Sequence, residues 1–384
     1  MNYEEIFSKY EEKKISGRYI HNENIEPLLY QDTRQGKAEI IGKSVLGKSI
    51  YSYKIGTGTT KILAWSQMHG NESTTTKALF DLFNFFDGQS KDASSILKHF
   101  TFCFIPILNP DGAKSYTRVN ANGIDLNRDA QDLSQPESKV LRQIYEEFQP
   151  DYCYNLHDQR TIFGVGDNSK PATVSFLAPS YNEACDWNDT RIKAISVIVG
   201  MNKVLQEFIP DQIGRFDDAF NLNCVGDTFQ FLGTPTILFE AGHYQNDYQR
   251  EKTRKYIFFA LLSGFNTIYE NVIVDNDFNF YMNIPQNKST FFDFVYKNVK
   301  INYDSSEKII NFAAQYNEEL IDNTIFFNAF IVKIGDLNNN HGHVEMNFEG
   351  KLFSDSVENI PKLNQKADFC LDKSIKIVNG AIKL

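Results

Sequence analysis

The sequence predicts an α/β fold in which helices sandwich a mixed, mostly parallel sheet, followed by a small β-rich C-terminal domain. Apolar runs alternate with amphipathic helical patterns over the first 270 residues, and this alternation is typical of a largely parallel sheet. After about residue 273 the helical patterns give way to short strand-like pieces separated by polar turns. At 384 residues the chain is long enough for one large domain and one small one.

The expected strands are of two kinds. Residues 39–56 alternate apolar and polar positions around "LGK" and predict an antiparallel hairpin. Later runs are apolar throughout, which indicates strands buried on both faces of a sheet. These runs are residues 61–68, 101–108, 151–157, 173–178 and 234–241.

Helical patterns lie between the apolar runs. The segment "STTTKALFDLFNFF" begins with Ser73, a candidate N-cap, and "PESKVLRQIYEEF" carries Pro136 in its first turn, as helix starts prefer. Two further long helices are expected at residues 189–209 and 247–270. We therefore predict one α/β domain over residues 1–272, with its core at about 40–270, and a β-rich accessory domain over 273–384.

Charge and cysteine content restrict the class of protein. The net charge of −10 disfavours nonspecific binding to nucleic acid or to an anionic membrane surface. The first twenty residues contain no apolar stretch, so neither a signal peptide nor a membrane anchor is expected. The five cysteines are dispersed and never form a CxxC pair, which favours reduced thiols and a cytoplasmic location.

A candidate metal site follows two of the buried strands. His69 and Glu72 lie in "MHGNES" directly after the strand at 61–68, and His157 ends the strand at 151–157. Gly70 permits a sharp turn between His69 and Glu72. Ligand sites of open α/β sheets collect beyond the carboxyl ends of the strands. Two imidazoles and one carboxylate suit zinc with a fourth position left open for water.

A second cluster of polar residues points to an anion. Residues 109–131 follow a buried strand and carry Arg118, Asn127 and Arg128. Guanidinium groups bind carboxylates through paired hydrogen bonds and can stabilise an oxyanion. Glu240 ends a further strand. An anion-binding loop beside a metal explains this placement better than a solvated loop does.

These motifs resemble those of the zinc carboxypeptidases of the carboxypeptidase A family. The matching motifs span about residues 40–269 in this order: "HGNE", "NPDG", an arginine before "NANGIDLNRD", "NLHD" and "FEAG". The C-terminal region lies outside the resemblance. By this resemblance, His69, Glu72 and His157 are expected to bind Zn²⁺.

The resemblance also implies roles for the remaining polar residues. Arg118 would polarise the scissile carbonyl and stabilise the oxyanion, while Asn127 and Arg128 would bind the terminal carboxylate of the substrate. Glu240 would act as the general base on the activated water and then as the acid that protonates the leaving amine.

The stretch before Glu240 departs from the family pattern. The family places a mobile tyrosine about twenty residues before the catalytic glutamate, but residues 215–231 contain phenylalanines and no tyrosine. Tyr181 and Tyr244 are possible replacements. Asp227 either pairs with a basic or amino-bearing substrate side chain or caps the helix that begins near it; a preference for basic residues is not inferred.

Other polar residues allow more than one interpretation. His243 either lines the cleft or binds a loop carbonyl, and Asp158 either orients a metal ligand or faces solvent. The "HGH" motif at His341 and His343 is typical of a hairpin tip, although a second metal site is an alternative.

The leading hypothesis is zinc-dependent hydrolysis of a peptide or amide bond next to a C-terminal carboxylate, on small or cell-wall-derived peptides. One alternative is an N-acyl amino acid deacylase of the aspartoacylase type, which shares "HGNE" and "DLNR". Another is a non-catalytic binding protein that retains the fold. The expected partner is a substrate with a free carboxylate, and the oligomeric state is not predicted.

Overall fold

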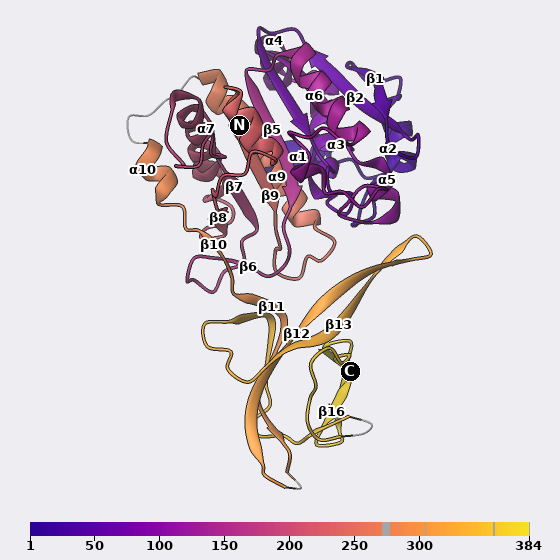
Figure 1. Cartoon of the computed structure of the whole chain (residues 1–384), viewed down its shortest axis with the longest axis vertical. Coiled ribbons are helices and arrows are strands. Elements are labelled where there is room, and N and C mark those ends of the chain that lie inside the picture. The colour runs from indigo at the N-terminus through magenta and orange to yellow at the C-terminus, as the bar shows by residue number, and fades with distance from the viewer. Residues whose placement is uncertain (271–276, 304, 356–357, 384) are drawn as a thin grey trace. The chain divides into compact units, whose positions relative to one another are not determined.

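Figure 1 shows the computed structural model of the chain, which describes residues 1–270, 277–303, 305–355 and 358–383. These residues form two compact units. The first contains Met1–Gln159 and Ala172–Asn287, and the second contains Arg160–Pro171 and Lys288–Leu384. The predicted boundary between residues 272 and 273 lies outside the described residues.

The first unit is built on one eight-stranded mixed sheet with the order β1-β2-β4-β3-β5-β9-β7-β8. The four central strands, β4, β3, β5 and β9, are mutually parallel. Antiparallel pairs join β1 to β2, β2 to β4, and β7 to β9. The strand bounds are β1 (Lys37–Lys43), β2 (Ser49–Gly56), β3 (Thr60–Trp65), β4 (Phe100–Ile105), β5 (Tyr152–Asp158), β7 (Val174–Leu177), β8 (Ile213–Arg215) and β9 (Thr236–Ala241).

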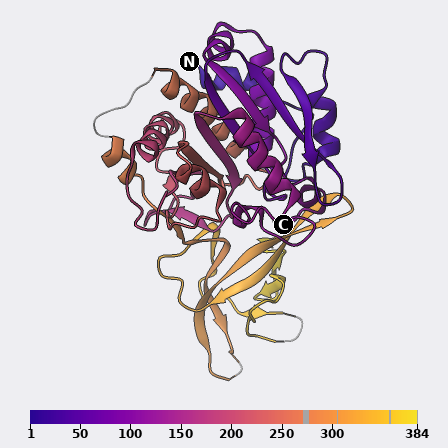
Figure 2. The same cartoon turned by 45° about the horizontal axis from the view of Figure 1, so that its top comes forward.

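Helices cover both faces of this sheet (Figure 1, and turned by 45° in Figure 2). One face packs against a large cluster that includes residues of α1, α2, α3, α4, α7 and α9, and the other packs against α6 and α8. The bounds are α1 (Tyr3–Tyr10), α2 (Asn22–Leu29), α3 (Thr74–Asp87), α4 (Lys91–His99), α5 (Pro110–Ser115), α6 (Pro136–Phe148), α7 (Asp189–Leu205), α8 (Val225–Phe231), α9 (Glu251–Glu270) and α10 (Asp277–Met282). The predicted α/β sandwich is confirmed.

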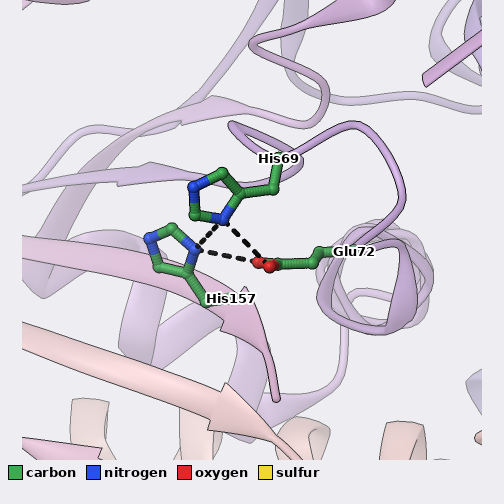
Figure 3. Close-up of side chains that lie close together, drawn as sticks. All are labelled: His69, Glu72 and His157. Atoms are coloured by element: carbon green, nitrogen blue, oxygen red, sulfur yellow. Dashed lines mark hydrogen bonds and ion pairs between the residues drawn. The ribbon is translucent and has the colours of Figure 1, made fainter. Parts of the chain in front are cut away.

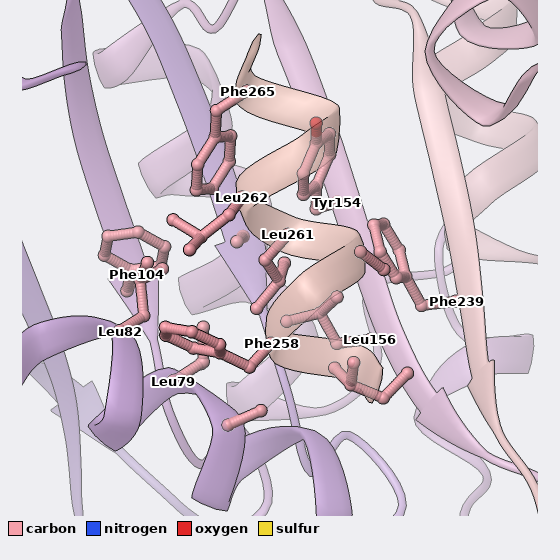
Figure 4. Close-up of a cluster of buried hydrophobic side chains, with 14 of the residues drawn as sticks. Leu79, Leu82, Phe104, Tyr154, Leu156, Phe239, Phe258, Leu261, Leu262 and Phe265 are labelled. Atoms are coloured by element: carbon pink, nitrogen blue, oxygen red, sulfur yellow. The ribbon is translucent and has the colours of Figure 1, made fainter. Parts of the chain in front are cut away.

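The continuous apolar runs of the sequence follow from this burial on both faces. In β3, Ile62 and Ala64 belong to one core cluster, whereas Leu63 and Trp65 belong to the other. Figure 4 shows the larger cluster, in which α9 presents Phe258, Leu261, Leu262 and Phe265 to side chains of α3, β4, β5 and β9. These four side chains are fully buried.

Two elements differ in detail from the sequence expectation. The helix expected at 247–270 begins at Glu251, because the carboxylate of Asp247 accepts hydrogen bonds from the backbone N–H groups of residues 251, 252 and 253. Beyond residue 273, where strand-like pieces were expected, the first described element is the helix α10, whose Tyr281 is buried and accepts a hydrogen bond from the N–H of Ala178.

The second unit contains two four-stranded sheets with the orders β13-β12-β11-β14 and β15-β16-β17-β18. Its core contains Phe294, Tyr296 and Phe312 from the first sheet and Phe353 and Phe369 from the second. The bounds are β6 (Phe163–Val165), β10 (Asn287–Ser289), β11 (Phe291–Ile301), β12 (Lys308–Ile321), β13 (Thr324–Ile334), β14 (His341–Asn347), β15 (Phe353–Ser354), β16 (Phe369–Leu371), β17 (Ile375–Val378) and β18 (Ala381–Ile382). None of the helices in the described part of the chain has the length and apolarity to cross a membrane.

The "HGH" motif does not form a hairpin tip. His341 and His343 begin β14, which pairs in parallel with β11. The His343 ring stacks on Phe291 at 4.8 Å, and its Nε2 lies 2.8 Å from the carbonyl oxygen of Thr161. The ring of His343 is thus part of the packing of the second unit.

Candidate metal and substrate site

The turn between β3 and α3 carries the first two predicted metal ligands. Gln67 has a positive φ of 43°, and a Cβ at Gly70 would lie 2.0 Å from the carbonyl carbon of Gly112. Only glycine therefore permits this close approach of two backbones. The side chain of Gln67 is buried and braces the turn, because its Nε2 donates to the carbonyl oxygens of Ile20 (2.9 Å) and Gly70 (2.8 Å).

His69, Glu72 and His157 converge, as Figure 3 shows. Nδ1 of His69 lies 2.9 Å from Oε1 of Glu72, and Nδ1 of His157 lies 2.9 Å from Oε2 of Glu72. The two Nδ1 atoms are 3.1 Å apart. All three side chains are buried at the carboxyl ends of β3 and β5.

The donor set fits a zinc ion. Zn–N bonds of about 2.0–2.1 Å place two nitrogen ligands roughly 3.3 Å apart at a tetrahedral angle, close to the spacing of these two Nδ1 atoms. Two imidazole nitrogens facing each other at 3.1 Å need a proton or a cation between their lone pairs. The second ring nitrogen of His157, Nε2, is buried and makes no hydrogen bond to any residue that the structure describes.

Asp125 is a site residue that the sequence analysis missed. Its Oδ1 accepts a hydrogen bond from Nε2 of His69 at 2.9 Å, which leaves Nδ1 of that ring facing Glu72. Burial raises the pKa of Asp125, but the contacts with His69 and Arg118 outweigh burial and hold this pKa well below its usual range. The signal for it is its place as the first residue of "DLNR", two and three residues before the predicted substrate ligands Asn127 and Arg128.

Arg118 lies against the ligand cluster. Its Nε donates to Oδ2 of Asp125 (3.1 Å), and its Nη1 donates to Oε1 of Glu72 (3.2 Å). The side chain remains 49% exposed, so the guanidinium group is accessible from solvent while two of its nitrogens are tethered. This position suits a group that binds an oxyanion beside a metal.

Asn127 and Arg128 lie near the start of α8. The Oδ1 of Asn127 accepts a hydrogen bond from the N–H of Val225 at 3.0 Å. Nη1 of Arg128 lies 2.7 Å from the carbonyl oxygen of Asn127 and 3.1 Å from Sγ of Cys224. Arg128 is exposed and forms no ion pair with the residues that the structure describes, so its charge is available to an anion.

Glu240 lies on the strand next to His157. The two residues are paired in the parallel register of β5 and β9, so their side chains leave the same face of the sheet. Burial, followed by the negative charges of Glu72 and Asp158, raises the pKa of Glu240 well above its usual value. The net pKa shift of Glu72 has the opposite sign. Burial raises its pKa too, but contacts with His69 and His157 outweigh burial and lower the pKa.

Comparison with known proteins relates this geometry to a family. Residues 31–172 match the family model described as zinc carboxypeptidase. Carboxypeptidase SOL1 of Arabidopsis thaliana is 31% identical over 151 residues, which are 33% of this chain and 31% of that protein. Carboxypeptidase 2 of Trichophyton rubrum is 26% identical over 188 residues, which are 47% of this chain and 33% of that protein.

Residues 31–172 are thus similar to the zinc carboxypeptidase family. The chain spans about a third of the length of these curated relatives. Two solved structures share the fold. A metallo-carboxypeptidase from Burkholderia cenocepacia has a TM-score of 0.51 and 18% identity, covering 65% of this chain and 68% of that one. Thrombin activatable fibrinolysis inhibitor has a TM-score of 0.53 and 15% identity, and the match covers 70% of this chain and 81% of that one.

The region in which the family tyrosine is missing contains an ion pair. Asp218 lies 2.5 Å from Nη2 of the buried Arg191, which also donates to the carbonyl oxygen of Cys185. Of the two tyrosines considered as replacements, Tyr244 packs against Tyr256 at 5.8 Å at the edge of the core, and Tyr181 lies half-buried in the loop after β7.

Asp158 contacts a predicted metal ligand and does not face solvent. Its side chain is buried, and Oδ2 accepts hydrogen bonds from the N–H (3.1 Å) and the hydroxyl (2.6 Å) of Thr74 at the start of α3. The backbone N–H of Asp158 donates to Oε2 of Glu72 at 3.1 Å. The residue therefore joins β5 to α3 and helps to orient Glu72.

Asp227 and His243 are both buried. Asp227 lies within the first turn of α8, whose N-cap is Cys224, and its Oδ2 accepts from the N–H of Asn221 at 3.2 Å. Burial raises the pKa of Asp227 to about 7. The ring of His243 packs against Tyr248 at 4.7 Å.

Proposed function

We propose that this chain is a zinc-dependent carboxypeptidase that hydrolyses the peptide or amide bond next to a free C-terminal carboxylate. The convergence of His69, Glu72 and His157 carries the proposal, together with the hydrogen bonds that join Arg118 to Glu72 and Asp125. The similarity of residues 31–172 to the zinc carboxypeptidase family supports it further.

Substrate binding would begin with the terminal carboxylate. Arg128 is exposed and offers a planar pair of donors, and Asn127 lies next to it at the start of α8. A carboxylate held there would place the adjacent carbonyl toward Arg118, whose tethered guanidinium can donate to the oxygen as negative charge develops on it.

The chemical step would use one ion and one carboxylate. A zinc ion held by His69, Glu72 and His157 would supply a Lewis acid that activates water at neutral pH. Glu240 would accept a proton from the attacking water on its carboxylate and then donate it to the leaving amine. Its position in register with His157 supports this role.

The finer proposal concerns the substrate: small peptides, including cell-wall-derived peptides with γ-linked amides. A free terminal carboxylate is the one feature that the site residues require, so linkage has to be tested directly. The zinc-loaded protein should be assayed on α-linked dipeptides, γ-linked amides, peptides with an amidated C-terminus and N-acetyl amino acids.

Release of one C-terminal residue from peptides with a free carboxylate, and its loss on amidation, is the expected result. Release of amino acid from N-acetyl amino acids alone would instead favour a deacylase. The Glu240→Gln variant should retain zinc while losing turnover, because the amide cannot accept the proton. Cleavage at the full rate by this variant would remove Glu240 from the mechanism.

A further inference from the structure

Arg250 is a buried arginine that no part of the proposed chemistry uses. It lies just before α9 and is 1% exposed. Its Nη1 donates to the carbonyl oxygen of Ala241 at 2.6 Å, and its Nη2 donates to the carbonyl oxygen of Gln159 at 2.8 Å. One guanidinium group therefore bridges the ends of β9 and β5.

The two bridged carbonyls belong to the strands that carry the site. Ala241 follows Glu240, and Gln159 lies two residues after His157. The last backbone bond between these strands runs from the N–H of Gln159 to the carbonyl oxygen of Ala241 at 2.9 Å. Beyond it the N–H of Gly242 bonds to Thr173, while the chain after Gln159 enters the second unit. Arg250 thus bridges the two strands where their ladder stops.

The guanidinium group is itself held in place. Arg250 has a φ of 61°, and its N–H donates to the carbonyl oxygen of Asp247 at 3.0 Å. The carboxylate of Asp247 binds the first N–H groups of α9 and fixes the helix start. The charge of Arg250 also acts on the carboxylates of Asp158 and Glu240. The guanidinium group of Arg250 therefore brings two hydrogen-bond donors in a fixed geometry, and one positive charge, to the strand ends that carry Glu240 and His157.

We propose that Arg250 is a positioning residue that fixes Glu240 relative to His157 by bridging the ends of β9 and β5. The inference rests on the proposed carboxypeptidase function. Loss of the Arg250 side chain would let the ends of β5 and β9 separate. The general base Glu240 would then move relative to the metal ligands. Asn127 and Arg128 lie on a different segment, so the binding of the terminal carboxylate would be unaffected.

Arg254 provides a matched control. It is also 1% exposed and lies one turn further along α9, but its partners are the carboxylates of Asp81 and Glu251 and the carbonyl oxygens of Glu12 and Ile15. Arg250→Met and Arg254→Met each remove one buried guanidinium from the same region. Both variants should have a lower melting temperature than the wild-type protein, as expected when buried carbonyls lose their donors.

Only the Arg250 variant should show a specific kinetic defect. We expect kcat to fall about a hundredfold for Arg250→Met with KM within about twofold of wild type, because a displacement of about 1 Å in the site has effects of this size. The zinc dissociation constant should rise about tenfold, as for other residues that orient metal ligands. Arg254→Met should change neither kcat nor zinc affinity by more than about threefold.

Arg250→Lys separates positioning from charge and keeps the experiment interpretable if the methionine variant does not fold. Lysine keeps the charge but lacks the rigid paired donors, so a clear loss of kcat supports the proposal. Wild-type kcat in Arg250→Lys, or equal losses in the Arg250 and Arg254 variants, would overturn it. If the wild-type protein cleaves no peptide, the proposed function fails, while zinc affinity alone still compares the two arginines.

Discussion

Asp227 offers a quantitative test of burial near the candidate substrate site. Asp227 as a whole is 5% exposed. Its carboxylate accepts a hydrogen bond from the N–H of Asn221, while the positive charges of Arg128 and Arg191 offset burial only in part. Its pKa is about 7 instead of 3.8. This difference corresponds to about 4 kcal/mol for ionising the carboxyl group within the fold.

The sign follows from proton binding. Because the folded chain binds this proton more tightly than the unfolded chain, protonation of Asp227 stabilises the fold fully below pH 3.8, and this stabilisation is lost as the pH rises through about 7. Asp227→Asn does not titrate and keeps an acceptor for the N–H of Asn221. Relative to wild type, the variant should therefore gain about 2.5 kcal/mol of unfolding free energy between pH 5 and pH 8.

Urea unfolding of both proteins at pH 5, 6, 7 and 8 measures this difference. Asp129→Asn is a suitable control, because burial raises the pKa of Asp129 less than its hydrogen bonds from Ser134 and Gln135 lower it. That carboxyl group is ionised in both states above pH 5, so its variant should differ from wild type by a constant amount. An equally constant difference for Asp227→Asn would refute the reasoning, since the carboxyl group would then titrate normally.

Three further predictions concern the metal, the oxyanion and the core. Glu72→Gln should bind less than one equivalent of zinc by atomic absorption after dialysis, and a chelator should lower the melting temperature of wild type more than that of the variant. Arg118→Ala should lower kcat about 10²- to 10³-fold in steady-state assays, and a loss below about threefold would exclude a contact with the oxyanion. Phe258→Ala, in the fully buried core of α9, should cost about 3–5 kcal/mol of unfolding free energy, whereas the same change at Phe280, which is 49% exposed, should cost less than about 1 kcal/mol.

Periodicity and strand ends predicted the framework of the fold. The hairpin of β1 and β2, the buried central strands and the helices α3, α6 and α7 lie where the sequence placed them, because burial on both faces of a sheet leaves a clear apolar run. The same reasoning placed His69 and His157 at neighbouring strand ends, and the structure brings them together.

Hydrogen bonds from side chains to backbone groups leave no comparable pattern in the sequence. Arg250 binds two carbonyl oxygens, and a carbonyl group looks the same at every residue, so its partners could not be read from the sequence. Gln67 was missed as part of the site for a similar reason, since its partners include the backbone carbonyl groups of Ile20 and Gly70. Ser73 was expected to cap α3 but donates its hydroxyl to the carbonyl oxygen of Arg18.

The interrupted connectivity of the second unit has a practical consequence for anyone who shortens the gene. Arg160–Pro171 belongs to that unit although more than a hundred residues separate it from the rest. The carbonyl oxygens of Thr161 and Ile162 bind His343 and the N–H of Phe291. A stop codon after residue 287 would therefore strip partners from a loop that starts three residues beyond His157. No single cleavage site releases the second unit intact, and trimming the C-terminus also removes the hydrogen-bond partners of residues 161 and 162.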